Sequence, residues 1–250
     1  MQSEVLFREG HHEFILLHRN SAEAEQGIPS NQYLIRHGDT AALLDPGGFG
    51  VLPGVLTRLV SYLPPDRVKA IFLSHQDPDI VGGLASWLDS TPAIAYLPEA
   101  WIRFVPHVGL DQTDRVVGIP DQGAEIEVAP GFRLQIHPAN FLHSPGQINV
   151  YDPIAGILFS GDIGAAVTGD DDLYVDDFDS HRANVEGFHR RYMAGNRALR
   201  TWLRRIENLP IRQLAPQHGP VYRGAAVREL FDWLRELRCG LDLMPADEPG

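Results

Sequence analysis

Residues 68–79, with the sequence VKAIFLSHQDPD, decide the fold of this chain. The first seven are almost continuously apolar, which is typical of a strand buried on both faces. The run leads directly into His75, Asp77 and Asp79, and residues 80–88 then follow a helical pattern. Open α/β sheets bind their ligands where a buried strand ends and a helix begins. The stretch therefore predicts an α/β fold with a ligand site at the end of this strand.

The residues before this stretch predict a meander followed by a helix. Apolar runs bounded by turn residues indicate strands at 12–17, 31–36 and 41–44, and the last run ends in the turn sequence DPGG at 45–48. Residues 51–63 carry apolar side chains at helical spacing before two prolines stop the pattern.

The second half of the chain repeats this order of strands and helices with a different sequence. Its expected strands are residues 132–136, 147–151, 156–160 and 211–215, and its expected helices are residues 188–209 and 227–237. Two halves built this way predict two packed sheets with helices outside. We expect a single domain over residues 1–250, because no flexible linker separates the halves.

Composition and charge exclude several classes of protein. With 44% hydrophobic and 22% charged residues, disorder is excluded as the main state. The 33 acidic residues exceed the 21 basic ones, and the net charge of -12 repels nucleic acid. The single cysteine, Cys239, allows no internal disulfide and fits a reducing cytoplasm. The N-terminal residues lack the features of an export signal, and no apolar run is long enough to span a membrane.

Polar residues follow apolar runs at three further places. His143 lies in FLHSPG, Asp162 in FSGD and His218 in PQHGP, each beside glycine or proline and hence on a tight loop. Taken alone, Asp162 could be a helix N-cap, His218 an ordinary turn residue, and the HxDxD at residues 75–79 a polar loop. Together they follow strands in the order expected of one shared edge. Imidazole and carboxylate bind divalent iron, manganese or zinc, so these three histidines and three aspartates could hold two metal ions.

Two other groups of residues are alternative candidates for metal binding. His137 lies only six residues before His143, but it falls on the polar phase of the FRLQIHP alternation, so we rank His143 above it. Residues 169–179 (GDDDLYVDDFD) are dense in carboxylates, yet they lack the ligand spacing, central glycine and terminal glutamate of a calcium loop. We expect a solvated loop there.

At these residues the chain resembles the metallo-β-lactamase fold superfamily. The resembling motifs occur in order along nearly the whole chain: DPG at 45–47, LSH at 73–75, HSPG at 143–146, FSGD at 159–162 and QHG at 217–219. The resemblance implies a four-layer αββα sandwich, the metallo-β-lactamase fold.

The first metal motif departs from the pattern of the family's hydrolases, which is HxHxDH. Asp77 stands at the second histidine position and Ile80 at the last. A carboxylate at the former position resembles the diiron branch, the flavodiiron proteins and the oxygen-binding diiron proteins. Carried over residue by residue, this resemblance implies one iron bound by His75, Asp77 and His143 and a second iron bound by Asp79 and His218, with Asp162 bridging both.

The resemblance also implies a function, which the chemistry of the ligands supports. Three aspartates leave two ferrous ions with one net positive charge, and anionic oxygen donors favour iron or manganese over zinc. We expect an oxygen-binding, and potentially oxygen-sensing, diiron protein with two iron ions that binds or reduces O2 or NO. No flavin is expected in this chain, so turnover as an oxidoreductase would need a separate electron donor. A signalling partner and a homodimer remain open.

Two alternatives use the same fold or the same ligands differently. A dinuclear zinc or manganese hydrolase would attack an ester, thioester or phosphodiester with a metal-bound hydroxide. A purely structural metal protein fits less well, because structural zinc sites are compact and rich in cysteine.

Overall fold

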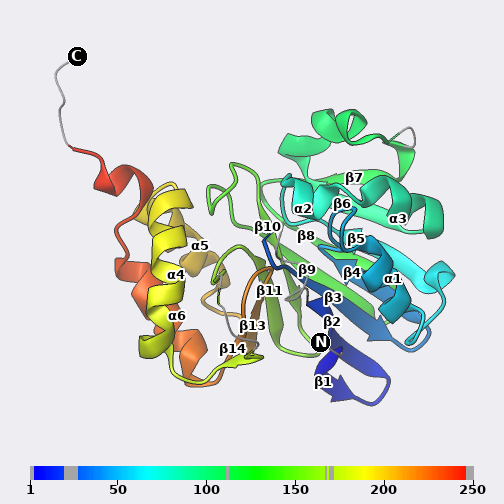
Figure 1. Cartoon of the computed structure of the whole chain (residues 1–250), viewed down its shortest axis with the longest axis horizontal. Coiled ribbons are helices and arrows are strands. Elements are labelled where there is room, and N and C mark those ends of the chain that lie inside the picture. The colour runs from blue at the N-terminus through cyan, green and yellow to red at the C-terminus, as the bar shows by residue number, and fades with distance from the viewer. Residues whose placement is uncertain (1–2, 20–27, 111–112, 167, 169–171, 246–250) are drawn as a thin grey trace.

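Two sheets packed face to face organise the computed structural model, which describes residues 3–19, 28–110, 113–166, 168 and 172–245 (Figure 1). Each sheet has seven strands. The first half of the chain forms one sheet and most of the second half forms the other, as the two-sheet prediction required.

The strands of the first sheet lie side by side in chain order. The first four pair antiparallel, and the fourth to seventh run parallel. The strands are β1 (Glu4–Glu9), β2 (His12–Arg19), β3 (Asn31–His37), β4 (Thr40–Leu44), β5 (Val68–Phe72), β6 (Ile94–Pro98) and β7 (Val116–Ile119).

The second sheet has the order β12-β14-β13-β11-β10-β9-β8. Its meander of four antiparallel strands is extended by β13, which runs parallel to β11. The strands are β8 (Ala124–Ala129), β9 (Phe132–Pro138), β10 (Ile148–Asp152), β11 (Ile157–Gly161), β12 (Tyr174–Val175), β13 (Gln213–Pro216) and β14 (Val221–Arg223).

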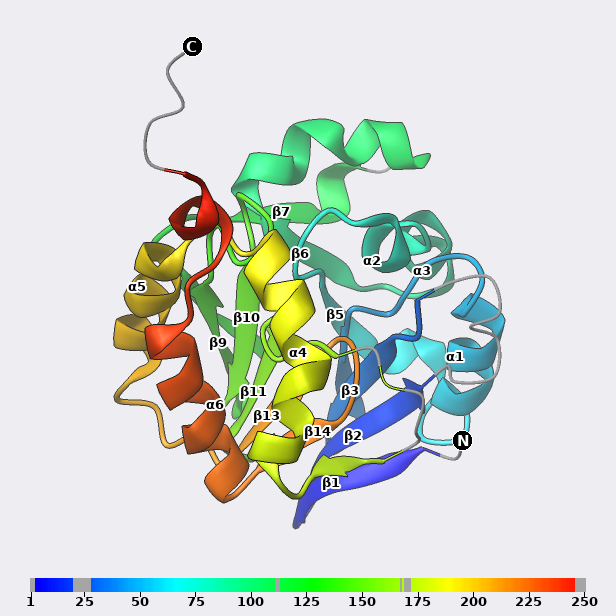
Figure 2. The ribbon, with the colours of Figure 1, turned by 60° about the vertical axis from the view of Figure 1, so that its left-hand side comes forward.

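Helices cover the outer face of each sheet, which gives the predicted four-layer αββα sandwich (Figure 2). The first sheet carries α1 (Leu52–Leu59), α2 (Pro78–Val81), α3 (Leu84–Ser90) and the 3₁₀ segments η1 (Pro65–Arg67), η2 (Glu99–Val108) and η3 (Thr113–Arg115). The second carries α4 (Phe178–Tyr192), α5 (Asn196–Ile206), α6 (Ala225–Glu236) and the 3₁₀ segment η4 (Gly240–Leu243). Among the described residues, the helices do not combine the length and the hydrophobicity needed to cross a bilayer.

A core of large apolar side chains joins the two sheets. Phe14 and Phe72 come from the first sheet, Phe132 and Phe159 from the second, and all four are fully buried. Separate apolar clusters lie between each sheet and its helices. β5 is buried at four of its five residues, as its apolar run predicted.

The helix predicted over residues 80–88 is wrong, because the structure has two short helices there. α2 ends at Val81 with Gly82 as its C-cap, and α3 begins at Leu84 with Gly83 as its N-cap. A Cβ on Gly83 would lie 2.5 Å from the carbonyl oxygen of Gly47. The two glycines thus let the turn at residues 45–48 approach the backbone between the helices.

The single helix predicted over residues 188–209 is also wrong. α4 begins ten residues earlier and ends at Tyr192, and α5 begins at Asn196. Between them, Ala194 donates its N–H to the carbonyl of Phe141 (3.1 Å) and accepts from the N–H of Leu241 (2.9 Å). These tertiary hydrogen bonds replace the helical ones, which the apolar spacing alone does not reveal.

The acidic segment at 169–179 is described only in part, since residues 169–171 lie outside the described residues. Its later part forms β12 and the start of α4. Asp177 caps α4, accepting from the N–H of Asp179 at 3.1 Å. This carboxylate therefore has a structural role.

The substitution Phe159→Ala should destabilise the protein by about 3–5 kcal/mol, because it leaves a cavity between the sheets. The matched change Phe104→Ala, at a side chain 43% exposed, should cost less than about 1 kcal/mol. Urea unfolding followed by circular dichroism measures both. Equal losses would contradict the account of the inter-sheet core.

Candidate metal centre

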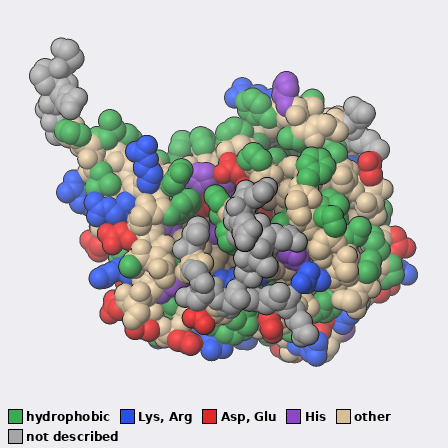
Figure 3. Space-filling view, viewed as in Figure 1, with side chains coloured by type: hydrophobic (Ala, Val, Ile, Leu, Met, Phe, Trp, Pro, Cys, Tyr) green, Lys and Arg blue, Asp and Glu red, His purple; other side chains and the backbone are tan. Residues whose placement is uncertain are grey.

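The six predicted ligands come from four segments that follow strands at one edge of the sandwich, and one of them, Asp79, lies in the first turn of α2. His75, Asp77 and Asp79 follow β5, and Asp77 is the N-cap of α2. His143 lies between β9 and β10, Asp162 directly follows β11, and His218 lies in the turn between β13 and β14. Histidine and acidic side chains gather on this face between the two helical layers (Figure 3).

Four ligand atoms form a first group. The Nε2 atoms of His75 and His143 are 3.2 Å apart. Oδ2 of Asp162 lies 2.7 Å from Nε2 of His143 and 3.4 Å from that of His75. Oδ2 of Asp77 lies 3.4 and 3.5 Å from the same two nitrogens. Separations of this size suit four donors around one metal ion with bonds of about 2.0–2.2 Å.

A second group shares the carboxylate of Asp162. Its other oxygen, Oδ1, lies 3.6 Å from Nε2 of His218, which in turn lies 3.5 Å from Oδ2 of Asp79. Asp162 thus presents one oxygen to each group. The structure brings all six predicted residues together, three imidazoles and three carboxylates.

The two groups differ in exposure. The side chains of His75 and Asp162 are 1% and 4% exposed, whereas those of Asp77 and Asp79 are 35% and 38% exposed. Among the described residues, the side of the centre with Asp77 and Asp79 is therefore the less buried one.

The carboxylates change the protonation of the imidazoles. Burial alone would lower the pKa of His143, but hydrogen bonds to Asp162 and Asp77 outweigh it and raise the pKa to about 9. In return, hydrogen bonds from His143 and His75 hold the pKa of Asp77 well below its usual range. Positive charge between the carboxylates therefore stabilises the cluster. A bound metal ion can supply that charge in place of the protons on the imidazoles.

The donor set fits a pair of divalent ions. Oδ1 of Asp162 is buried and, within the described part of the chain, has no hydrogen-bond donor. A buried carboxylate oxygen without a donor is costly unless a cation satisfies it. His75, His143 and Asp162 also place one ligand atom each within 4.8 Å of one another.

Comparison with known proteins decides the family. A family model described as the ODP family beta lactamase matches residues 28–219. The chain belongs to the ODP family. This membership confirms the resemblance to the diiron branch of the metallo-β-lactamase fold.

Solved structures agree with this membership. The chain is 39% identical to the peroxy diiron species of chemotaxis sensor ODP, with a TM-score of 0.87 and coverage of 97% of this chain and 98% of that one. The apo state of chemotaxis sensor ODP from T. denticola is 40% identical, with a TM-score of 0.86, over 96% and 97% of the two chains. The metal-soaked Flv1 flavodiiron core of Synechocystis sp. PCC6803, at 20% identity and a TM-score of 0.76 over 94% of this chain and 61% of that chain, shares the fold.

Curated relatives of the ODP-family chain are longer proteins. It is 27% identical to putative diflavin flavoprotein A 1 of Nostoc sp. PCC 7120 over 78% of this chain and 34% of that protein. It therefore spans about a third of the length of the diflavin flavoproteins that it matches.

Neighbouring residues that the sequence analysis missed orient His75. Nδ1 of His75 lies 2.9 Å from Oγ of Ser74, whose hydroxyl and N–H donate to the carboxylate of Asp45 at 2.6 and 2.7 Å. Burial raises the pKa of Asp45 to about 7, although the hydrogen bonds from Ser74 oppose the rise. Because Nδ1 is engaged, Nε2 of His75 faces the other ligands. Only the DPG and LSH motifs hinted at this contact.

Two glutamines hold the exposed aspartates. The amide of Gln76 donates to Oδ1 of Asp77 (2.9 Å) and accepts from the hydroxyl of Ser144 (2.6 Å), next to His143. The amide of Gln217 donates to Oδ2 of Asp79 (3.0 Å). Gln76 thus ties its sequence neighbour Asp77 to the segment that carries His143, and Gln217, next to His218, reaches across to Asp79.

His189 supports the loop that carries Asp162. It is fully buried in α4, its Nδ1–H donates to the carbonyl of Val185, and its Nε2 accepts from the N–H of Gly164 at 3.0 Å. Burial lowers the pKa of His189 to about 4, so this histidine stays neutral and keeps that tautomer.

The rings of Phe188 and Tyr192 lie edge-on to His143.

Two positions weighed from the sequence lie outside the ligand set. His137 lies within β9, where it pairs with Asn149 of β10. Ile80 is fully buried in the apolar cluster beneath the first helical layer. It offers no donor to the second group.

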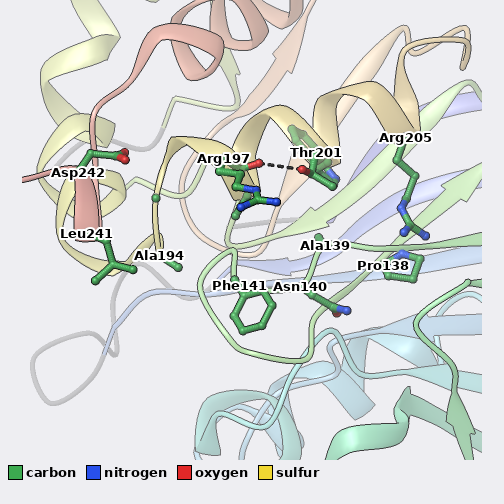
Figure 4. Close-up of a pocket in the computed structure, with 13 residues that line it drawn as sticks. Pro138, Ala139, Asn140, Phe141, Ala194, Arg197, Thr201, Arg205, Leu241 and Asp242 are labelled. Carbon is green, nitrogen blue, oxygen red and sulfur yellow. Dashed lines mark hydrogen bonds between the residues drawn. The ribbon is translucent and has the colours of Figure 1, made fainter.

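The segment that positions His143 also forms one wall of a cavity of about 550 Å³, whose opposite wall is α5 (Figure 4). Phe141 lies on one side, and Arg197, Thr201 and Arg205 lie along the helix. The six predicted ligands are not among the residues that line it. The cavity is therefore separate from the candidate centre.

Replacing Ser74 by alanine should weaken metal binding by roughly 10–100-fold, because His75 loses the partner that orients its ring. The exposed Ser61→Ala change, which removes a hydroxyl that donates to the carbonyl of Arg58, serves as the control. Competition with a coloured iron chelator measures both affinities. An unchanged affinity in Ser74→Ala would show that this contact does not orient the ligand.

Proposed function

We propose that this chain is an oxygen-binding diiron protein, built as one domain over residues 1–250. His75, Asp77, His143 and Asp162 would hold the first iron, and Asp79, His218 and the same Asp162 the second. Membership of the ODP family and the likeness to an ODP chemotaxis sensor support the assignment. When bound, a ferrous pair supplies electrons and a position at which O2 or NO can bind.

One observation carries this proposal. The two oxygens of Asp162 face different groups of ligands, with Oδ2 2.7 Å from His143 and Oδ1 3.6 Å from His218. A carboxylate divided in this way suits two ions rather than one. With Asp77 and Asp79 it supplies three anionic oxygen donors, which favour iron over zinc.

The surrounding residues would keep the two ions unequal. Among the described residues, the first group has four protein donors, whereas the second has Asp79, His218 and the shared carboxylate. Ile80 adds no donor there. The second ion would thus keep positions open to a small molecule, on the side where Asp79 is 38% exposed.

Sensing is the role we favour over turnover. An oxygen sensor needs to bind its ligand and pass the change to a signalling partner, whereas continuous reduction of O2 or NO needs an electron donor that renews the ferrous state. The likeness to a chemotaxis sensor supports the first role. We place the protein in the cytoplasm, because a ferrous pair needs a reducing compartment.

Metal and optical analysis test the function directly. Protein prepared without oxygen should contain two irons per chain, and a visible absorption band should appear when the reduced protein meets air. Zinc at both positions together with turnover of a phosphodiester or thioester would instead identify a hydrolase and overturn the proposal.

The variant His218→Gln should reduce the iron content from two ions to about one per chain, because the second group loses the imidazole of His218 while the first keeps all four donors. His107→Gln, at an exposed histidine of η2, should keep both ions. Iron analysis after gel filtration measures the content. Loss of both ions, or of neither, in His218→Gln would contradict the division into two groups.

The variant Asp77→His should shift metal selectivity towards zinc, because an imidazole replaces one of the hard anionic donors. Metal analysis of protein grown with equal iron and zinc compares the variant with the parent. The same iron-to-zinc ratio in both would refute the role assigned to Asp77.

A further inference from the structure

Three histidines and one aspartate form a second polar cluster, at the end of the sheets opposite the candidate centre. The cluster contains His11, His12, His37 and Asp152. His37 ends β3, whereas Asn31, at the start of that strand, donates to the carbonyl of Pro216, two residues before His218. The cluster is therefore about a strand's length away from the predicted ligands.

Hydrogen bonds link the four side chains in a row. Oδ2 of Asp152 lies 2.7 Å from Nε2 of His12, and Nδ1 of His12 lies 3.1 Å from Nδ1 of His37. Nε2 of His37 lies 2.9 Å from Nε2 of His11. Burial falls along the row: Asp152 is fully buried, His12 is 2% exposed, and His11 lies in an exposed turn.

The buried end of the row assigns the protons. The carboxylate of Asp152 is an acceptor, so Nε2 of His12 carries the donated proton and its Nδ1 is left bare. That bare nitrogen accepts from Nδ1–H of His37, so Nε2 of His37 is an acceptor and its lone pair takes the N–H of His11. Asp152 is itself held, since its Oδ1 accepts from the N–H groups of Ile154 and Ala155 at 3.0 and 3.3 Å.

This arrangement matches the way in which proteins prepare a histidine to bind metal. A metal-binding histidine almost always donates its other ring N–H to a neighbour, which sets the tautomer and the ring orientation. Here the hydrogen bonds from His37 to His12 and from His12 to Asp152 set the tautomer and the ring orientation of His37. The ring of His37 is also stacked on Phe132, with centroids 5.5 Å apart and 16° between the planes. Gly38 donates its N–H to the carbonyl of His11 (2.9 Å), which joins the turn that carries His11 to the turn that follows His37.

We propose that Nε2 of His37 and Nε2 of His11 chelate a divalent transition-metal ion of square-planar or octahedral preference, Cu2+ or Ni2+. With metal–nitrogen bonds of about 2.0–2.1 Å, two donors about 2.9 Å apart subtend an angle near 90°. That is the angle between adjacent ligands in tetragonal and octahedral sites, whereas a tetrahedral zinc site would require about 3.4 Å between the donors.

The exposed histidine completes the site at little cost. His11 is exposed, so it can move its proton to Nδ1 while the two Nε2 atoms stay about 2.9 Å apart. Water would fill the remaining positions, since the two imidazoles are the protein donors of the site. Imidazole suits both ions, and divalent copper is the more tightly bound of the two in a given nitrogen site.

Titration of the full-length protein with Ni2+ tests the proposal, with its diiron centre filled and oxidised beforehand. The parent should bind one more Ni2+ per chain than His37→Gln or His11→Gln, and His107→Gln should match the parent. With Cu2+ as the probe, the electron paramagnetic resonance signal should show two nitrogen donors in the parent and fewer in either variant. Asp152→Asn should bind Ni2+ roughly 10–100-fold more weakly, because His37 loses the assigned tautomer.

Several results would overturn the proposal. Equal nickel binding by the parent and His37→Gln is one, and an equal loss in His107→Gln is another. A copper spectrum that is the same in the parent and both variants is a third. Iron content measured in every sample keeps this test separate from the proposed diiron function, because His11 and His37 take no part in the candidate centre.

Discussion

The shared carboxylate of Asp162 is the interaction on which the rest of the site depends. It is nearly buried at the end of β11, and its two oxygens face imidazoles from different loops. A buried carboxylate is unfavourable unless it is paired. The histidines after β5, β9 and β13 therefore have to converge on it, and the polar edge of the sandwich is organised around one negative charge.

Both sheets are needed to bring those histidines together. Ser74 accepts the N–H of Ile148 at 2.9 Å, so the end of β5 in the first sheet is hydrogen-bonded to the start of β10 in the second. The phenylalanine core between the sheets holds the same alignment further along the strands. Packing that seems remote from the chemistry thus sets the distance between ligands from the two halves of the chain.

Both ends of the sandwich use the same device, a buried carboxylate that fixes the orientation of histidines. At one end Asp45 acts through Ser74 on His75, and at the other Asp152 acts through His12 on His37. In each case a hydrogen bond to Nδ1 directs Nε2 of the ring towards a neighbouring histidine, His143 at one end and His11 at the other. The fold can therefore present oriented imidazole lone pairs at two separate places.

The sequence by itself determined the α/β class, the main strands and the six polar residues that follow them. Strands buried on both faces are recognised by their continuous apolar runs. Polar residues directly after such a run lie at the edge of the sheet, so the local sequence pattern predicts both the strands and the polar residues at their ends. Only the tertiary structure decided where the helices break. The break at Gly83 depends on its close approach to Gly47, and the break at Ala194 depends on its hydrogen bond to Phe141, and both partners are far away in the chain. The tertiary structure also decided which oxygen of Asp162 faces which histidine and which neighbours orient each ring, since those distances arise only when loops from both sheets meet.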